Sequence, residues 1–547
     1  MTRGKIAWVW LLGIALPCLL MMGCGKRVTR VEAGDQTQVY HRGNGADPSD
    51  LDPQLITGDI EHHIVSSLLE GLVAEDPKDL HPVPGVAERW EISEDGKTYT
   101  FYLRKNAKWS NGDAVTADDF YKSYQRILSP GLLSEYNYML FVVENAEEFN
   151  AEKVKDFKQV GFQVIDPYTF QVKLKNSTPY FLSLITHPSW YPVHMPTILK
   201  FGKMDERGTR WTRPGNFVGN GAFRLSEWKV NNVLVVTNSP TYWDAKVVRL
   251  KEIRFYPTDN QDAEERSFRA GQLHSTYEVP LTKIEVYKKQ YPDLIHIDPL
   301  LSTYFYRVNV KKPPMDNLKL RKALAMAIDR ELIVEKIRRG GELPAYNLTP
   351  PGTAGYTARA QIKKDFAGAK KLLAEAGYPD GKGCPPIEIL INTHEAHKTI
   401  AEAIQSMWKE NLGLEVTIAN QEWKVYLDTQ KRIDYQVCRA GWSGDYVDPN
   451  SFLDLFLTGG GNNETGWSNK EYDNLIAEAG RTGDQQKRME VFQKAEAILM
   501  DELPIIPIYF YTRPVLRQPS LKGYYPNILD LHPFKWVYLE STPGKKE

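Results

Sequence analysis

The fold class is decided by IEILINTHEAHKTIAEAIQSMWKENLGLEVTIANQEWKVYLDTQKRIDYQVCRA, residues 387–440. Short apolar runs predict three strands, at 387–392, 414–419 and 435–440. One helix is predicted over 394–411, with Thr393 as its N-cap and Gly413 at its end, and a second starts near Glu422. This alternation indicates an α/β lobe, in which ligands commonly bind beyond the carboxyl ends of the strands. Arg439 is placed at such a strand end, with Asp445 in the loop that follows.

The first part of the chain contains local signals of other kinds. Residues 98–104 alternate between apolar and polar side chains, which is typical of a half-buried strand. Thr116 and Asp119 are three residues apart, the spacing of a helix N-cap and its partner. They predict a helix over 117–128, which Pro130 ends.

The N-terminus has the order of a bacterial lipoprotein signal. Arg3 and Lys5 precede an apolar run at 6–22, which is short for a membrane span, and a small residue stands before Cys24. We expect cleavage after residue 23, a lipid on the thiol of Cys24, and a tether over 24–35. The protein would then be exported to the periplasmic or extracytoplasmic face. The alternative is a plain secreted protein with a leftover cysteine.

Length, charge and cysteine content limit the class further. The mature chain would exceed the roughly 250–300 residues at which a single core stops growing, so two or three lobes are expected. The 68 Lys and Arg residues balance 69 Asp and Glu residues, which leaves no single-signed surface for nucleic acid. An oxidising compartment would allow a disulfide between Cys384 and Cys438.

Several patterns resemble catalytic or metal-binding motifs without matching them. The stretch HEAH, 394–397, has its histidines three residues apart, whereas the zinc-protease motif needs four. His62 and His63 are adjacent and would point in different directions on a helix, so we interpret them as exposed polar residues. The run GWSGD, 441–445, lacks the final glycine of the serine nucleophile elbow. We therefore predict no catalytic residue, no metal and no cofactor.

The stretch RAGWSGDYVDPNSF, residues 439–452, places an arginine, a tryptophan and an aspartate close together. One interpretation is a site for a zwitterion, in which Arg439 and Asp445 are opposite charges and Trp442 is an apolar wall. The other is an ordinary strand end with solvated charges. The residues alone leave both open.

Motifs spread over nearly the whole chain carry a family resemblance. They include LDPQLITG (51–58), FYLRKNAKWSNGDAVTADDF (101–120), ALAMAIDRELI (323–333), NQEWKVYLDT (420–429) and RAGWSGDY (439–446). In these motifs the chain resembles the oligopeptide-binding proteins of bacterial oligopeptide permeases, which belong to the family 5 extracellular solute-binding proteins. The resemblance implies an α/β fold of two lobes that close on ligand like a Venus flytrap, with an additional inserted domain.

The resemblance also implies domain boundaries and partners. Lobe I is expected at 36–70, 195–301 and 513–547, the inserted domain II at 71–194, and lobe III at 302–512. The expected partners are short peptides and the permease and ATPase subunits of an ABC transporter, and we expect a monomer. Rival functions are a receptor for murein peptide, a signalling peptide or another small solute, a secreted peptidase, and a structural lipoprotein that lost binding.

Site residues follow from the resemblance position by position. Asp445 would bind the ammonium of the peptide N-terminus. Arg439, Arg338 and His397 would bind the carboxylate of successively longer peptides. Further contacts with peptide side chains or backbone are expected from Trp423, Trp442, Tyr136, Tyr277, Gly58, Asp59, Gly441, Ser443, Gln430 and Glu278.

Some positions depart from the family pattern. Gln430 replaces an arginine that assists Arg439, and Glu278 replaces an asparagine near the pockets, which would favour basic side chains. Ser302 and Ser443 stand at two positions that form a disulfide in a relative.

Overall fold

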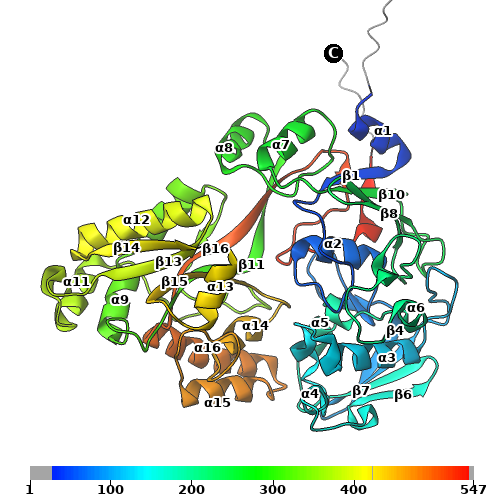
Figure 1. Cartoon of the computed structure of the whole chain (residues 1–547), viewed down its shortest axis with the longest axis horizontal. Helices are drawn as coiled ribbons and strands as arrows, with labels where there is room; N and C mark the ends of the chain where they lie inside the picture. The colour runs from blue at the N-terminus through cyan, green and yellow to red at the C-terminus, as the bar shows by residue number, and fades with distance from the viewer. Residues whose placement is uncertain (1–27, 422, 541–547) are drawn as a thin grey trace, which may run out of the picture.

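The structure, a computed structural model, describes residues 28–421 and 423–540. Figure 1 shows two halves joined by two long strands, β11 (Ile295–Val308) and β16 (Ile505–Leu516). We call residues 28–298 and 513–540 the first half, and residues 299–512 the second half. The expected two-lobed α/β fold is confirmed.

The first half contains two four-stranded sheets that share one core. One sheet has the order β1-β10-β9-β8 and the other the order β4-β5-β7-β6. Their strands are β1 (Val39–Gly43), β4 (Ala87–Ile92), β5 (Thr98–Leu103), β6 (Phe162–Asp166), β7 (Thr169–Lys173), β8 (Phe223–Lys229), β9 (Val233–Asn238) and β10 (Glu252–Tyr256). Two small hairpin-like sheets pair β2 (Val73–Glu75) with β3 (Pro82–Pro84), and β17 (Leu521–Lys522) with β18 (Tyr538–Leu539). One cluster of buried side chains runs through both four-stranded sheets, so neither has a separate core.

The helices of the first half cover these sheets and the top of the molecule in Figure 1. They are α1 (Arg30–Thr37), α2 (Asp59–Leu68), α3 (Ala117–Leu128), α4 (Ala146–Asn150), α5 (Phe181–Leu184), α6 (Met195–Phe201), α7 (Gln261–Arg269) and α8 (Leu281–Gln290). The predicted helix over 117–128 is confirmed as α3, and its capping box forms as predicted, since the Thr116 amide donates to Asp119 at 2.8 Å. The predicted strand at 98–104 is confirmed as β5, with alternate side chains buried.

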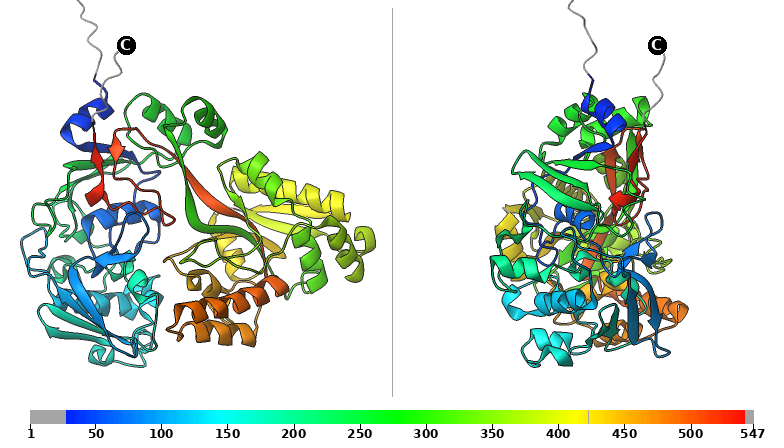
Figure 2. Two further views of the ribbon diagram at one scale, coloured as in Figure 1. Left: turned by 180° about the vertical axis from the view of Figure 1, so that it is seen from behind. Right: turned by 90° about the vertical axis from the view of Figure 1, so that its right-hand side faces the viewer.

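The second half is built on a six-stranded sheet of order β12-β16-β11-β15-β13-β14. Its shorter strands are β12 (Leu343–Pro344), β13 (Ile387–Asn392), β14 (Val416–Gln421) and β15 (Val437–Ser443). The helices are α9 (Leu318–Met326), α10 (Arg330–Leu332), α11 (Phe366–Glu375), α12 (Glu395–Leu412), α13 (Trp423–Lys431), α14 (Asn450–Leu453), α15 (Lys470–Ala479) and α16 (Gln485–Glu502). They pack around the sheet on a second core (Figure 2).

The predicted alternation over 387–440 is confirmed, but several boundaries were wrong, and β14 and β15 each start two residues later than predicted. The N-cap of α12 is His394, whose side chain accepts from the Ala396 amide, in place of Thr393. Strand β14 continues through the polar residues Asn420 and Gln421, because their backbones pair with β13. Strand β15 continues to Ser443 because it pairs with β11 over its whole length. Arg439 therefore lies inside β15 rather than at its end, and only Asp445 follows the strand.

The ladder between β11 and β16 runs through both halves. At one end Ile295 faces Leu516 in a small core under α7 and α8, and at the other Arg307 faces Ile505 in the core of the second half. The register shifts between Pro299 and Thr303 and again between Tyr304 and Phe305. These two strands are therefore the connection about which the halves can move.

A buried ion pair fixes the loop that follows β15. The Arg488 guanidinium, from α16, donates to both oxygens of Asp448 at 2.6 and 2.7 Å, and both side chains are almost fully buried. Such a pair depends on both members, because removing one leaves an uncompensated buried charge.

We predict that Asp448→Asn lowers the free energy of unfolding by about 3–5 kcal/mol. Differential scanning calorimetry should then record a fall in the Tm of the second half of the order of 10 °C. The matched control is Asp501→Asn, whose side chain is 71% exposed beside Lys322 and should cost less than about 1 kcal/mol. Equal Tm values for the two variants would contradict the conclusion that the Arg488–Asp448 ion pair stabilises the second half.

Candidate functional site

Two adjoining cavities form one long cleft between the halves. The first has a volume of about 300 Å³ and is lined by Asp445 and Tyr136. The second has a volume of about 920 Å³ and is lined by Arg439, Arg338 and His397. Both are lined by Asp59, Leu300, Ser302, Gly441, Trp442 and Ser443. The cleft therefore has Asp445 near one end and the guanidinium groups of Arg439 and Arg338 near the other, where Arg513 and several carboxylates also line the wall.

Asp445 is held in place by its loop. Its amide donates to the Ser451 hydroxyl at 2.9 Å, and the Gly444 amide donates to the Leu301 carbonyl at 2.7 Å. The carboxylate accepts from the Tyr138 hydroxyl at 3.1 Å and from the Tyr136 hydroxyl at 3.4 Å. Within the described residues, no cation forms an ion pair with Asp445.

Burial raises the pKa of Asp445 to about 6, against the two tyrosine hydrogen bonds, which lower it. Removal from water penalises the charged carboxylate, and neutral hydroxyls compensate only part of that penalty. A ligand cation would complete the site.

The Asp445 end of the cleft brings the two halves into contact. Asp445 belongs to the second half, whereas Tyr136 and Tyr138 belong to the first. Close by, the rings of Tyr446 and Tyr180 stack across the same boundary with centroids 5.1 Å apart. These contacts between the halves are aromatic packing, the guanidinium of Arg488 4.9 Å from the centre of the Tyr180 ring, and hydrogen bonds from tyrosine hydroxyls to a carboxylate.

Arg439 extends from β15 into a group of tyrosines. One guanidinium nitrogen donates to the Tyr511 hydroxyl at 3.2 Å, and the guanidinium lies 5.1 Å from the centre of the Tyr304 ring. Burial opposes the charge, but the tyrosines, Tyr511 and Tyr304 first, raise the pKa of Arg439 above its usual value. Its Nε has no hydrogen-bond partner, and no carboxylate pairs with it in the part of the chain that the structure describes.

Arg338 is less available than Arg439 to bind a ligand carboxylate. It pairs with the buried carboxylate of Glu342, four residues on, at 2.9 Å, and stacks 5.3 Å from the centre of the Tyr509 ring. The i, i+4 spacing of Arg338 and Glu342 was a readable signal in the sequence. A ligand carboxylate would have to share Arg338 with Glu342.

His397 faces the same cavity without a charge. Burial, together with the nearby charge of Arg439, lowers its pKa to about 2. The ring is therefore neutral at pH 7, and its Nδ1 has no hydrogen-bond partner. A ligand carboxylate would therefore meet a neutral ring at His397, which can still offer a hydrogen bond.

Most of the other expected residues also line the cleft. Gly58 and Asp59 lie at the start of α2, and Asp59 is an exposed carboxylate 3.6 Å from Arg513. Glu278 lines the larger cavity. Tyr277 lines neither cavity, although its hydroxyl accepts from Arg513, which lines the larger one, at 3.2 Å.

Gln430 and Trp423 are two further expected contacts that are not placed in the cleft. Gln430 is buried against the Cys438 sulfur and lines neither cavity, which corrects its assignment as a pocket residue. The side chain of Trp423 and the expected lipid site Cys24 lie outside the described residues.

Sequence reasoning missed several residues of the cleft. Tyr138, Tyr304, Tyr511 and Arg513 lie beside predicted site residues only because the chain folds back on itself. No local pattern distinguishes these side chains from other tyrosines and arginines of the sequence.

The structure also tests the expectations for the adjacent histidines and for the two cysteines. His63 is buried, not exposed, because it bridges Arg42 at 2.9 Å and Asp530. His62 packs edge-on against His187, with ring centres 5.0 Å apart. Cys384 and Cys438 are both free thiols, so they form no disulfide.

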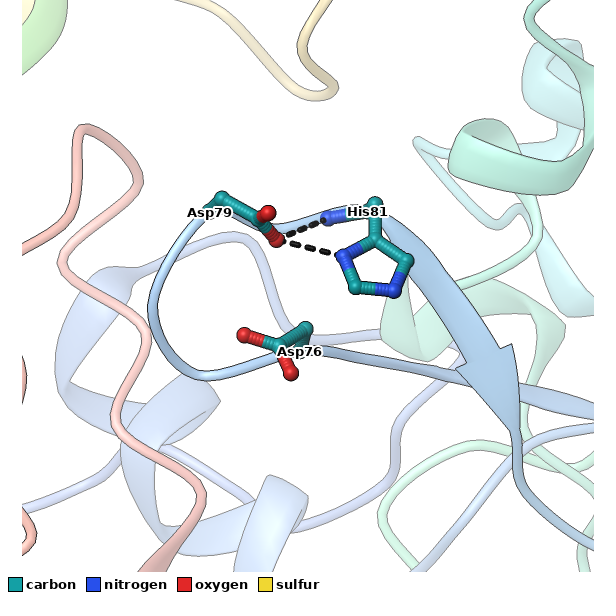
Figure 3. A group of neighbouring side chains, drawn as sticks. All are labelled: Asp76, Asp79 and His81. Atoms are coloured by element: carbon teal, nitrogen blue, oxygen red, sulfur yellow. Dashed lines mark hydrogen bonds and ion pairs between the residues drawn. The ribbon is translucent and has the colours of Figure 1, made fainter.

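One group of possible metal ligands stands out among the described residues, in the turn between β2 and β3 (Figure 3). His81 Nδ1 lies 2.5 Å from the Asp79 carboxylate, and Asp76 accepts from the Lys78 amide at 2.8 Å. These bonds hold an exposed turn together, and the turn carries no functional assignment. No helix in the described ranges combines the length and apolar character that a membrane span needs.

The chain belongs to the bacterial extracellular solute-binding proteins of family 5. The family description "Bacterial extracellular solute-binding proteins, family 5 Middle" matches residues 81–464. The chain is 38% identical over 497 residues to the periplasmic oligopeptide-binding protein OppA of Salmonella typhimurium, covering 89% of this chain and 90% of that protein. It is also 38% identical over 488 residues to the periplasmic murein peptide-binding protein MppA of Escherichia coli, covering 87% and 88% respectively.

A solved structure of Haemophilus influenzae OppA in complex with RPPGFSPFR has the same fold. Its TM-score is 0.78 at 36% identity, and the match covers 92% of this chain and 99% of that chain. The family resemblance stated from the sequence is thus confirmed.

The serine pair at the cleft has the geometry of a cross-strand pair. Ser302 and Ser443 are direct partners of β11 and β15, and their hydroxyl oxygens are 2.9 Å apart. We predict that the double variant Ser302→Cys, Ser443→Cys oxidises to a disulfide in air, because the facing side chains need little movement. Mass spectrometry should record the loss of two hydrogens, and each single variant is the control. Free thiols in the oxidised double variant would contradict this geometry.

Proposed function

We propose that this protein is the substrate-binding component of an ABC transporter that captures short oligopeptides in the cleft between its halves. The observation that carries the proposal is a pair of opposite charges, Asp445 and Arg439, that lack ion-pair partners in the described structure and line one cleft. A peptide zwitterion supplies both missing charges. The similarity to OppA proteins supports the same ligand class.

The backbone of the cleft also suits a peptide. Strand β15 pairs with β11 along one edge, but β13 pairs with the other edge only at Val437 and Cys438. Residues 439–443 therefore have one edge without a strand partner among the described residues. An extended peptide can add to such an edge through main-chain hydrogen bonds, which are indifferent to its side chains.

Charge fixes the register of the added strand. An ammonium and a carboxylate about 4 Å apart, at an effective dielectric of about 20, gain on the order of 4 kcal/mol before desolvation. Asp445 would select the free amine, and Arg439 the carboxylate of a short peptide. Arg338 and His397 would contact longer ones, the first as a shared cation and the second as a neutral hydrogen-bonding ring.

Ligand binding would favour closure of the halves. Asp445 is already partly desolvated by the tyrosines of the first half, and full enclosure of an unpaired carboxylate is strongly unfavourable. An ammonium at this point removes that penalty. The closed form would then present the loaded protein to permease and ATPase subunits.

Domain boundaries and location complete the proposal. We retain lobe I at 36–70, 195–301 and 513–547, domain II at 71–194 and lobe III at 302–512. Sheet β4-β5-β7-β6 falls within domain II, although its core is continuous with that of lobe I. Periplasmic relatives support an extracytoplasmic location, and we propose a lipid anchor at Cys24. No catalytic role is proposed.

We predict that affinity for a free tripeptide falls as pH decreases through about 6. The pKa of Asp445 is raised to about 6 in the unliganded protein, and a bound ammonium would lower it. The proton must therefore leave before the ammonium binds, and affinity should fall about tenfold per pH unit below that value. Isothermal titration calorimetry from pH 4.5 to about 8 measures this directly.

The matching variant is Asp445→Asn, which should lose most affinity and the pH dependence together. N-acetylated tripeptides should bind the wild-type protein poorly. Equal affinities of the wild-type protein for free and acetylated tripeptides would contradict the assignment of Asp445 as the amine site.

We predict that Arg439→Ala weakens tripeptide binding by about 2 kcal/mol or more, and pentapeptide binding by much less. The carboxylate of a pentapeptide would lie beyond Arg439, so the loss depends on length. Arg432→Ala is the control, since this arginine is 63% exposed and pairs with Asp428 at the end of α13. If Arg439→Ala weakens both lengths alike, the length dependence is wrong.

A further inference from the structure

A third cavity, of about 70 Å³, lies behind Asp445 in the first half. It is lined by Asp445, His62 and His187, which also line the Asp445 end of the cleft, and by Glu75 at the end of β2. A water-sized group needs about 10–15 Å³ on this measure, so the cavity accommodates about five of them. That space corresponds to the methylene chain and ammonium of one lysine side chain.

Besides Asp445 at its mouth, this cavity contains a second carboxylate that no cation neutralises, that of Glu75. One of its oxygens accepts from the Thr186 hydroxyl at 2.8 Å, and no ion pair to it forms within the described residues. The neighbouring Glu70 differs, because it is paired with Lys535 at 3.2 Å and accepts from Tyr242 and Trp243. Behind Asp445, the cavity therefore contains one satisfied ion pair and one carboxylate without a counter-charge.

The histidines do not supply that counter-charge. Burial lowers the pKa of His62 to about 4, that of His532 to about 4 and that of His187 well below its usual value. Burial also raises the pKa of Glu75 to about 7, which is the response of a carboxylate that lacks a cation.

We propose that this cavity is the subsite for the first side chain of the ligand, and that Glu75 selects a basic side chain there. The inference rests on the proposed function, since Asp445 must hold the ligand amine at the mouth of the cavity. Two carboxylates without cations, Asp445 and Glu75, border one cavity, and a peptide that begins with lysine or ornithine carries two neighbouring cations. The selected ligands are therefore short peptides with a basic first residue.

The test is a cycle of three peptides and three proteins. The peptides are Lys-Ala-Ala, norleucine-Ala-Ala and Ala-Ala-Ala, of which the first two differ mainly in charge. The proteins are the wild type, Glu75→Gln, and Glu94→Gln, which removes the same charge from an exposed position between β4 and β5. Calorimetry gives the ratio of the Kd values for the norleucine and lysine peptides in each protein.

We expect Glu75→Gln to reduce that ratio about tenfold or more, because close charge pairs are coupled by at least this factor. Glu94→Gln should leave the ratio unchanged, and Ala-Ala-Ala should bind all three proteins equally. An unchanged ratio in Glu75→Gln would overturn the inference while leaving the proposed function intact. A similar loss for all three peptides would also overturn it, since Glu75 would then act only on the fold.

The wild-type protein distinguishes failure of the inference from failure of the proposed function. If it binds Ala-Ala-Ala but shows no preference for lysine over norleucine, the subsite is not selective for charge. If it binds none of the three peptides, the proposed function itself is wrong, and the subsite assignment is wrong with it.

Discussion

The antiparallel ladder of β11 and β16 is the constraint on which the two halves depend. Its ends are buried in different cores, and the longest irregular stretch of its register lies between Pro299 and Thr303, with a second shift between Tyr304 and Phe305. Leu300 and Leu301, inside this irregular part, line the cleft. The freedom of the halves to move is thus concentrated at the level where ligand would bind, while each end of the ladder stays anchored by packing.

Charge is distributed differently in the scaffold and in the cleft. Scaffold charges such as Arg126 with Asp52 and Arg488 with Asp448 are buried as close pairs, at 2.6 Å each. In the cleft, Asp445 and Arg439 have only neutral hydroxyl partners. An unpaired buried charge is unfavourable. Side chains that carry one are therefore typical of sites where a bound ligand supplies the opposite charge. The contrast distinguishes the ligand site from structural ion pairs without reference to any relative.

The sequence predicted the parts of the molecule that local rules control. The alternation over 387–440, the capping box of α3 and the strand at 98–104 all depend on neighbouring residues, and all were correct. The end of β15 was wrong because pairing with β11, not side-chain type, extends it to Ser443. The charge state of His397 could not be predicted from the sequence, because its pKa depends on burial and on the nearby charge of Arg439 in β15. Tyr138 was missed because it meets Asp445 only across the two halves.

Breadth and selectivity in this cleft have separate physical origins. Contacts with the free edge of residues 439–443 and with the ligand ends depend on features that every peptide has, so they cannot discriminate among sequences. Discrimination must therefore come from charged or bulky groups on the cavity walls. Glu75 and Glu278 are such groups, and they lie near opposite ends of the cleft, in the cavities that also contain Asp445 and Arg439 respectively. A chain can thus keep the family's mode of binding while its side-chain preference changes through a few wall residues.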